Sequence, residues 1–223
     1  LISLLIIGSD SYATHLVGGS MSYEYKGRLP NGKYRYLLTI DMYRDCTGDV
    51  LFDDVIQVSA HHNNSTRTLF QAFPIRIVSK TIVNPPNGGV DCAFQPNVCL
   101  ERGFYEAMID LDPSSSGYHL VFQRCCRNTQ ENLIDDIGQT YYAFIPPTSI
   151  QNSSPTFTGV PSPYICQNDL ISIDNGARDP DGDSLVYSLE HPWAGGSEFD
   201  PFPQPRQTWP QIPAFDPVIY RPG

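Results

Sequence analysis

The stretch Lys33–Cys46, "KYRYLLTIDMYRDC", decides the fold class. Apolar side chains recur at every second position, and polar side chains fill most positions between them. A period of two is that of a β-strand with one buried and one solvent-facing side. We predict an inward set of Tyr34, Tyr36, Leu38, Ile40 and Met42 and an outward set that includes Arg35, Thr39 and Asp41.

The same alternation recurs along the chain. It is clearest in "FYEAMIDL" (104–111) and "GYHLVFQRCC" (117–126), and "DPSSSG" (112–117) between them predicts a hairpin-like loop. No window of convincing length shows a helical period of 3.6 residues, so we predict an all-β protein. Further strand candidates are residues 18–25, 54–60, 73–80 and 140–147.

A domain boundary is expected at residues 145–157, "IPPTSIQNSSPTF", where proline, serine and asparagine cluster between two strand-rich regions. Residues 14–150 would form the first β-sandwich domain, and 151–223 a second one with only two or three visible strands. We therefore expect tandem β-sandwich domains of the immunoglobulin or cadherin type.

Composition and the first residues bear on the compartment. The formal net charge is -10 with no basic run, which argues against binding to nucleic acids. Residues 1–13, "LISLLIIGSDSYA", are an apolar run too short to span a bilayer, and their last residues match a secretory cleavage site. We interpret them as the remnant of a signal peptide. The alternative is a strand packed on a neighbouring subunit.

Six cysteines fit an exported chain with three disulfides. Cys92 and Cys99 are separated by a short turn-forming segment, so we expect them to pair with each other. Cys46 is then expected to bind one member of the doublet Cys125-Cys126, which leaves the other member for Cys166.

The stretch "ARDPDGDSLVYSL" (177–189) places three aspartates at alternate positions just before an alternating apolar run. Crowded carboxylates repel each other unless a cation or water separates them. Calcium is the cation that best suits Asp179, Asp181 and Asp183, although an EF-hand is excluded because Ser184 stands where that loop needs glycine. The alternative is an acidic turn that binds nothing.

Catalytic motifs are missing from the sequence. His61 and His62 lie in "HHNNST", which we interpret as a solvated loop, and neighbouring residues on a strand would point to opposite faces. Neither a G-x-S-x-G motif nor a phosphate-binding glycine loop occurs. We therefore expect a protein that is not an enzyme.

Several segments, taken in order, resemble a known family. They are "ATHLVGGSMSYEYKG", "YRYLLTIDMYRDC", "FQRCCRN" and "SSPTFTGVPSPYICQNDLISIDNGARDPDGDSLVYSL". Together they look like the N-terminal region of gliding-motility-associated, type IX-secreted adhesin-like proteins of Bacteroidota. The resemblance implies export to the cell surface, a surface or matrix role and further sandwich domains beyond Gly223.

A second similarity is to cadherin-like modules, which bind calcium between domains through an acidic strand start. This resemblance implies that Asp179, Asp181 and Asp183 are calcium ligands, helped by Asn152 from the linker or by Asp174 and Asn175.

These observations lead to one expected function and one alternative. We expect a secreted, non-enzymatic surface protein, an adhesin or filament component, whose partners are other copies or domains of the same protein and an extracellular surface or glycan. The alternative is a polysaccharide-binding accessory module of a secreted hydrolase. A row of solvent-facing Tyr or Trp side chains would favour the second, because such rows bind sugar rings.

Overall fold

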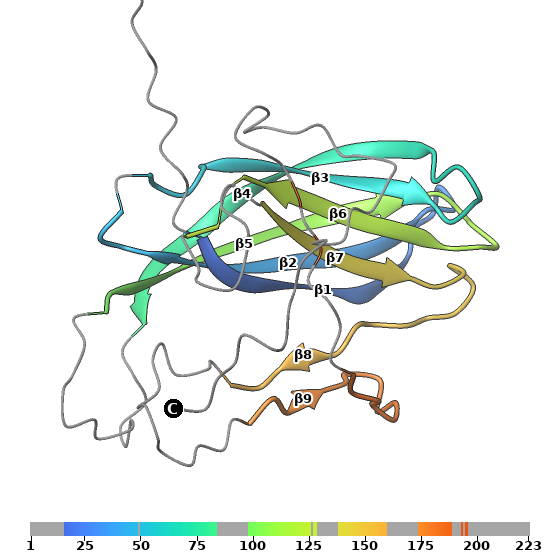
Figure 1. Ribbon diagram of the computed structural model, residues 1–223. Helices are drawn as coiled ribbons and strands as arrows, with labels where there is room; N and C mark the ends of the chain where they lie inside the picture. Colours follow the sequence, from blue (N-terminus) through green and yellow to red (C-terminus); the bar gives the residue numbers. More distant parts are fainter. Residues whose placement is uncertain are drawn as a thin grey trace, which may run out of the picture.

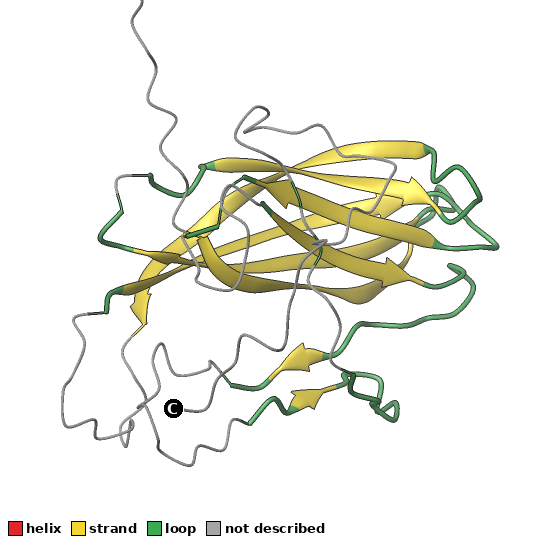
Figure 2. Cartoon of the chain, viewed as in Figure 1, coloured by secondary structure: helices red, strands yellow, loops and turns green. Residues whose placement is uncertain are grey.

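A computed structural model of the chain describes residues 16–48, 50–83, 98–125, 127–128, 138–159, 174–188, 193 and 195. Every regular element among them is a β-strand (Figures 1 and 2), which confirms the predicted all-β class. The strands are β1 (Leu16–Arg28), β2 (Tyr34–Asp45), β3 (Val55–His62), β4 (Leu69–Val83), β5 (Leu100–Leu111), β6 (Tyr118–Arg124), β7 (Gln139–Ile145), β8 (Thr156–Phe157) and β9 (Ala177–Arg178).

Seven strands form one antiparallel sheet in the order β1-β2-β5-β4-β3-β6-β7. The long strand β4 changes neighbours part of the way along. Its first half pairs with β3 up to Arg76, and its second half pairs with β5 from Arg76 onward, with a bulge between Ile77 and Ser79. A strand that changes sheets at a bulge forms the corner of a sandwich. The result is a sandwich-like fold of two layers, β1-β2-β5 and β3-β6-β7, joined by β4 (Figure 1).

The two end strands of this sheet, β1 and β7, lie side by side. The Tyr141 hydroxyl of β7 donates to the Gly18 carbonyl of β1 at 3.1 Å, and the Gln139 amide donates to the Leu16 carbonyl at 2.9 Å. Side chains from β7 therefore satisfy backbone groups of β1 where no continuous ladder joins the two strands.

The predicted inward side chains make the core. Tyr36, Leu38, Ile40 and Met42 of β2 are buried, and Tyr34 packs against the same cluster. The same holds for the inward sides predicted in residues 104–111 and 117–126. The core is closed by Tyr23, Ile56, Val58, Phe73, Ile75, Tyr105, Ile109, Leu111, Tyr118, Leu120, Phe122, Tyr141 and Ile145.

The predicted hairpin at residues 112–117 is wrong. Strands β5 and β6 are not neighbours: β5 pairs with β2 and β4, and β6 pairs with β3 and β7. The segment instead crosses from one layer to the other. Gly117 ends it with φ +88°, and a side chain there would overlap the Ile145 carbonyl oxygen, so this position requires glycine.

Strand β6 is buried on both sides, although its alternation predicted only one buried face. Its inner side chains enter the core, while His119, Val121 and Gln123 on the outer side are also buried. Tyr142 of the neighbouring strand β7 contacts His119 on this outer side, and the Trp193 ring packs on Tyr142 with the ring centres 4.8 Å apart.

In the region expected to form a second domain, the described strands are β8 and β9, two residues each, which pair antiparallel apart from the large sheet. The proposed signal remnant, residues 1–13, lies outside the described residues.

Candidate functional site at the junction of β1 and the acidic loop

The segment at the expected domain boundary is hydrogen-bonded to the edge of β1 that does not pair with β2. The backbone N–H of Tyr23 donates to Ser154 Oγ at 2.8 Å, and the Ser154 N–H donates to the Tyr23 carbonyl at 2.8 Å. The Tyr25 N–H donates to Ser153 Oγ at 3.2 Å, and Ser153 is only 2% exposed. The linker thus satisfies backbone groups of β1.

The acidic loop, defined here as Asp179–Asp183, is bonded to this linker. The Asp181 carboxylate accepts hydrogen bonds from the Ser153 backbone N–H and, at 3.4 Å, from the Ser153 hydroxyl. An ionised acceptor makes a stronger hydrogen bond than a neutral one. Asp181 therefore joins the acidic loop to the linker, and the linker joins it to β1.

Asp179 shapes the loop from within. Its Oδ1 accepts the backbone N–H of Asp181 at 2.8 Å and that of Asp183 at 3.3 Å. A side chain that accepts backbone N–H groups a few residues ahead stabilises a tight turn. Gly182 provides the positive φ of +81° that the turn requires.

Tyr23 lies beside the junction. Its hydroxyl donates to the Phe144 carbonyl at 2.9 Å and accepts from Asn152 Nδ2 at 3.1 Å. Burial raises the pKa of Tyr23 to about 12, and the negative charges of Asp181 and Asp179 add to the rise. The buried Tyr23 side chain therefore contacts both β7 and the linker, and the charges of the acidic loop affect its pKa.

The six proposed calcium ligands are only partly brought together. Asn152 and Asp181 both lie at the junction through their contacts with Ser153, whereas the Asp174 carboxylate accepts the N–H of Gly176 at 2.7 Å. Asn175 and the carboxylate of Asp183 have no bond to the others. Among the described residues, no group of three or more His, Cys, Asp or Glu side chains is placed to hold a metal ion. As arranged, the carboxylates serve as hydrogen-bond acceptors, and calcium binding stays a prediction.

Two of the three predicted disulfide pairings are wrong, and the third involves Cys166, which lies outside the described residues. Cys46 bonds to Cys99, with their Cα atoms 5.3 Å apart, so neither the Cys92–Cys99 pair nor a bond from Cys46 to the doublet exists. The reason is the β2–β5 register, which ends with Asp45 opposite Leu100 and so places Cys46 opposite Cys99. Cys125 is also disulfide-bonded. Cys92, Cys126 and Cys166 lie outside the described residues.

The sequence suggested that His61 and His62 lie in a solvated loop, and this is wrong. His61 and His62 end β3, and His61 is fully buried, with Nε2 2.9 Å from Ser59 Oγ and Nδ1 3.0 Å from the Arg67 carbonyl oxygen. Burial lowers the pKa of His61.

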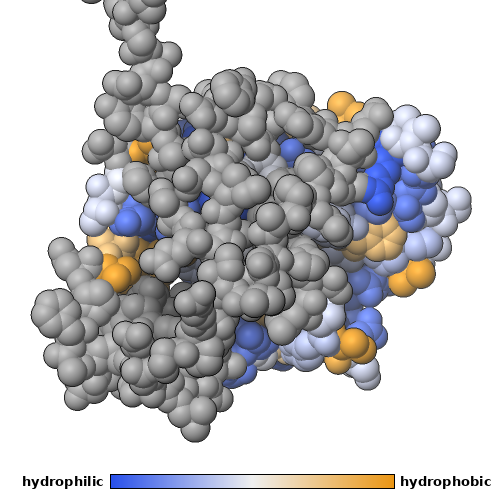
Figure 3. All heavy atoms as spheres, in the orientation of Figure 1, coloured by the Kyte–Doolittle hydropathy of each residue, from blue (hydrophilic) through white to orange (hydrophobic). Residues whose placement is uncertain are grey.

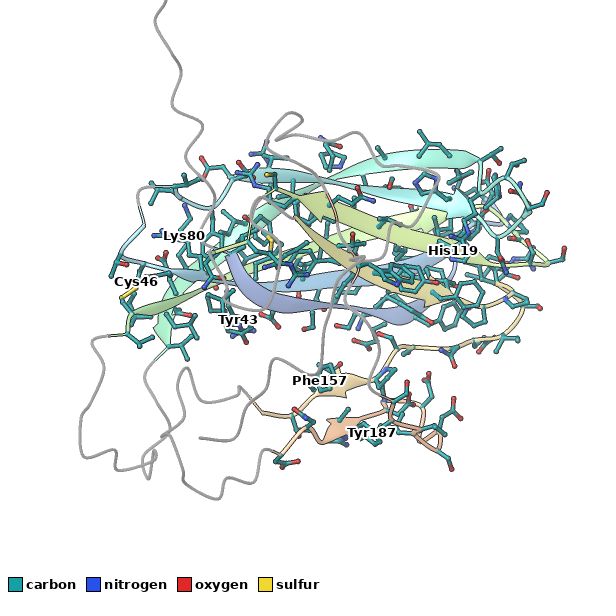
Figure 4. All side chains as sticks on the ribbon, viewed as in Figure 1. Tyr43, Cys46, Lys80, His119, Phe157 and Tyr187 are labelled. Carbon is teal, nitrogen blue, oxygen red and sulfur yellow. A yellow bond between two sulfur atoms is a disulfide. The ribbon has the colours of Figure 1, made fainter. Side chains whose placement is uncertain are left out.

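His119 of β6, labelled in Figure 4, is the ladder partner of His61 and is also buried. Its Nε2 donates to Asn63 Oδ1 at 3.0 Å, and its Nδ1 accepts from the Tyr142 hydroxyl at 2.9 Å. This pattern suits the neutral ring. Burial lowers the pKa of His119 to about 4, helped by the positive charge of Arg67 and by His61.

Fold and site together define a disulfide-bonded, all-β, sandwich-like fold, with Ser153 and Ser154 after the large sheet bonded back to β1. No protein-family model, no curated protein and no solved structure matches the chain. The described residues contain no helix that is both long and apolar enough to cross a membrane.

Proposed function

We propose that this chain is a non-enzymatic, extracellular module of a larger surface protein, an adhesin or filament component built of β-sandwich domains of the immunoglobulin or cadherin type. The observation that carries the proposal is that all three described cysteines are in disulfides. Disulfides persist in oxidising compartments and are rare in the cytosol.

The linker contacts support a role in a series of modules. Ser153 and Ser154 are bonded to β1, and Asp181 is bonded to Ser153, so the chain leaves the sheet through an ordered joint. Flexible linkers between domains are usual, and a bonded linker restricts the angle between successive units. A limited angle suits a protein that must extend from a surface.

The exposed aromatic side chains favour this role over polysaccharide binding. Most described tyrosines are in the core or partly buried against it. Among the described aromatic residues, only Phe157 and Tyr187 have an exposed fraction above one half, and both belong to the β8–β9 region (Figure 4). The row of solvent-facing rings expected for a sugar platform is therefore not found in the described part of the sheet.

Surface labelling of intact cells tests the location. A membrane-impermeant amine reagent should modify the protein before lysis, because Lys26, Lys33 and Lys80 all have side chains at least 31% exposed. Labelling that appears only after lysis would contradict the proposal. A cytosolic marker protein must stay unlabelled in the same sample.

Calcium at the joint is part of the proposal and has its own test. A ligand that binds only the folded state raises its stability by mass action. Millimolar calcium should therefore raise the melting temperature of the wild type and not that of Asp181→Ala. Equal melting curves with calcium and with chelator would show that the acidic loop binds no calcium and is only an acidic turn.

A further inference from the structure

The fold covers most of its strand edges, which otherwise offer unpaired backbone groups to other chains. The edge of β1 is bonded to Ser153 and Ser154, and β7 lies beside β1. The first half of β4 lacks a neighbour on its β5 side, but Pro74 interrupts that edge because proline has no N–H to offer.

Among the described residues, the second half of β4 has a strand on one side only. The last backbone bond on the β3 side runs from the Ile77 N–H to the carbonyl of Asp54, at 3.0 Å, and Asp54 is the residue just before β3 begins. From Ser79 to Val83 the strand pairs with β5 on one side, and no described residue hydrogen-bonds to its backbone on the other side. Residues 78–82 are all exposed, with Val78 60% and Ile82 55% accessible.

The chemistry of this edge fits another β-strand and not an apolar ligand. The hydrophobic residues (orange) on the described part of the face drawn in Figure 3 form separate small spots among hydrophilic ones. Residues 79–83, "SKTIV", combine β-branched side chains with a single charge. An extended chain can pair with such an edge through its main chain.

We propose that residues 79–83 of β4 pair, antiparallel, with the same edge of a second copy of this chain. In an antiparallel ladder, a residue whose N–H and C=O face the partner strand lies opposite a residue whose N–H and C=O face back. When two identical strands pair symmetrically, this rule requires one residue to lie opposite its own copy, and that residue is the centre of the register. The choice of that residue decides which side chains face each other.

Thr81 is the centre that the side chains favour. A register centred on Lys80 would place two ammonium groups opposite each other, and one centred on Ser79 would include the bulged residue Val78. Centring on Thr81 pairs Thr81 with its own copy and Lys80 with Ile82. Opposed threonines stabilise a strand pair, whereas opposed like charges destabilise it.

The contact is weak between free molecules. Five paired residues bury much less than the roughly 1,000 Å² expected of a stable interface, and each copy carries a formal net charge of -10. Lys80, bonded to Asp54 at 3.6 Å, adds a charge of the kind that limits edge pairing. Copies held close together on a surface have a high effective concentration, which favours a weak contact. The relevance of this contact in the cell therefore rests on the proposed function.

Cysteine cross-linking of the purified chain tests the register. In the proposed pair, the Cα atoms of the two Thr81 residues lie about 4.5–5.5 Å apart, within the range that a disulfide spans. Thr81→Cys should form a covalent dimer in a glutathione redox buffer. Ser79→Cys is the matched control, because it lies on the same face of the same strand, yet its two copies would lie about 14 Å apart.

We expect at least about tenfold more dimer from Thr81→Cys than from Ser79→Cys, because only the first pair meets disulfide geometry. Adding Ile82→Lys to Thr81→Cys should lower the yield, because the introduced ammonium group would then face Lys80 of the second copy. Equal yields from the two single variants, or a monomeric Thr81→Cys, would overturn the proposal. Neither result would bear on the extracellular location, since the purified protein is used.

Discussion

At the scale of single residues, His119 makes stability depend on pH. Its pKa is about 4 in the folded protein and about 6.5 in an unfolded chain. Between these values the unfolded state binds the extra proton, so stability falls as the pH falls. We expect His119 to contribute a loss of about 2 kcal/mol in the free energy of unfolding between pH 7 and pH 5.

Urea unfolding at the two pH values measures this loss. His61, whose pKa is also lowered, acts in the same direction, whereas burial raises the pKa of Asp53, which acts in the opposite direction. His119→Gln should show a smaller pH dependence even if it is less stable overall. An unchanged dependence in His119→Gln would contradict the assignment.

Asp181 and Asp183 form a matched pair for testing the junction. Asp181→Ala removes the acceptor of the buried Ser153 N–H, whereas no described residue bonds to the carboxylate of Asp183. Leaving a buried donor unsatisfied costs about 1–3 kcal/mol. Hydrogen exchange at Ser153 should therefore become faster in Asp181→Ala and stay near the wild-type rate in Asp183→Ala. Equal rates in the two variants would show that Asp181 does not hold the linker.

At the scale of elements, the turn that starts β6 depends on one glycine. Gly117→Ala would need a positive φ and would bring a methyl group against the Ile145 carbonyl oxygen. We expect a loss of about 1–3 kcal/mol, as for other strained backbone positions. Gly18→Ala is the control, because nothing lies within 4 Å of its added carbon. Thermal unfolding of both variants measures the difference, and a Gly117→Ala as stable as Gly18→Ala would refute this explanation of the turn.

The strands were predictable from sequence, and their partners were not. A period of two is a local property, so the inward residues of β2 and β5 could be named from each strand alone. Pairing depends on contacts between distant segments, such as Tyr34 opposite Leu111. The hairpin at 112–117 and the Cys92–Cys99 bond were both predicted from closeness in sequence, and both failed for this reason.

The candidate site divides in the same way. The aspartates of the acidic loop were evident as a motif, and so was the linker that holds Asn152. The bond from Ser153 to Asp181 was not predictable, because it joins residues 28 positions apart. The burial of His61 and His119 was also hidden, since it depends on cover over the outer side of β6.

At the scale of the whole molecule, the Cys46–Cys99 bond connects the fold with the location. It fastens β2 to β5 at one end of the sheet, and the loop that it closes, with a sequence separation of 53, should stabilise the fold by about 4 kcal/mol. It requires both the β2–β5 register and an oxidising compartment. The state of these two cysteines in the native protein therefore tests the fold and the proposed location together.

Disulfide mapping is the most direct measurement. The protein is isolated from its natural source with free thiols alkylated at harvest, and is then digested with trypsin and chymotrypsin, which can cut after Phe94 between Cys92 and Cys99. We predict a linked peptide pair that contains Cys46 and Cys99. Alkylated Cys46 and Cys99 would contradict the extracellular location, and a Cys92–Cys99 link would contradict the β2–β5 register.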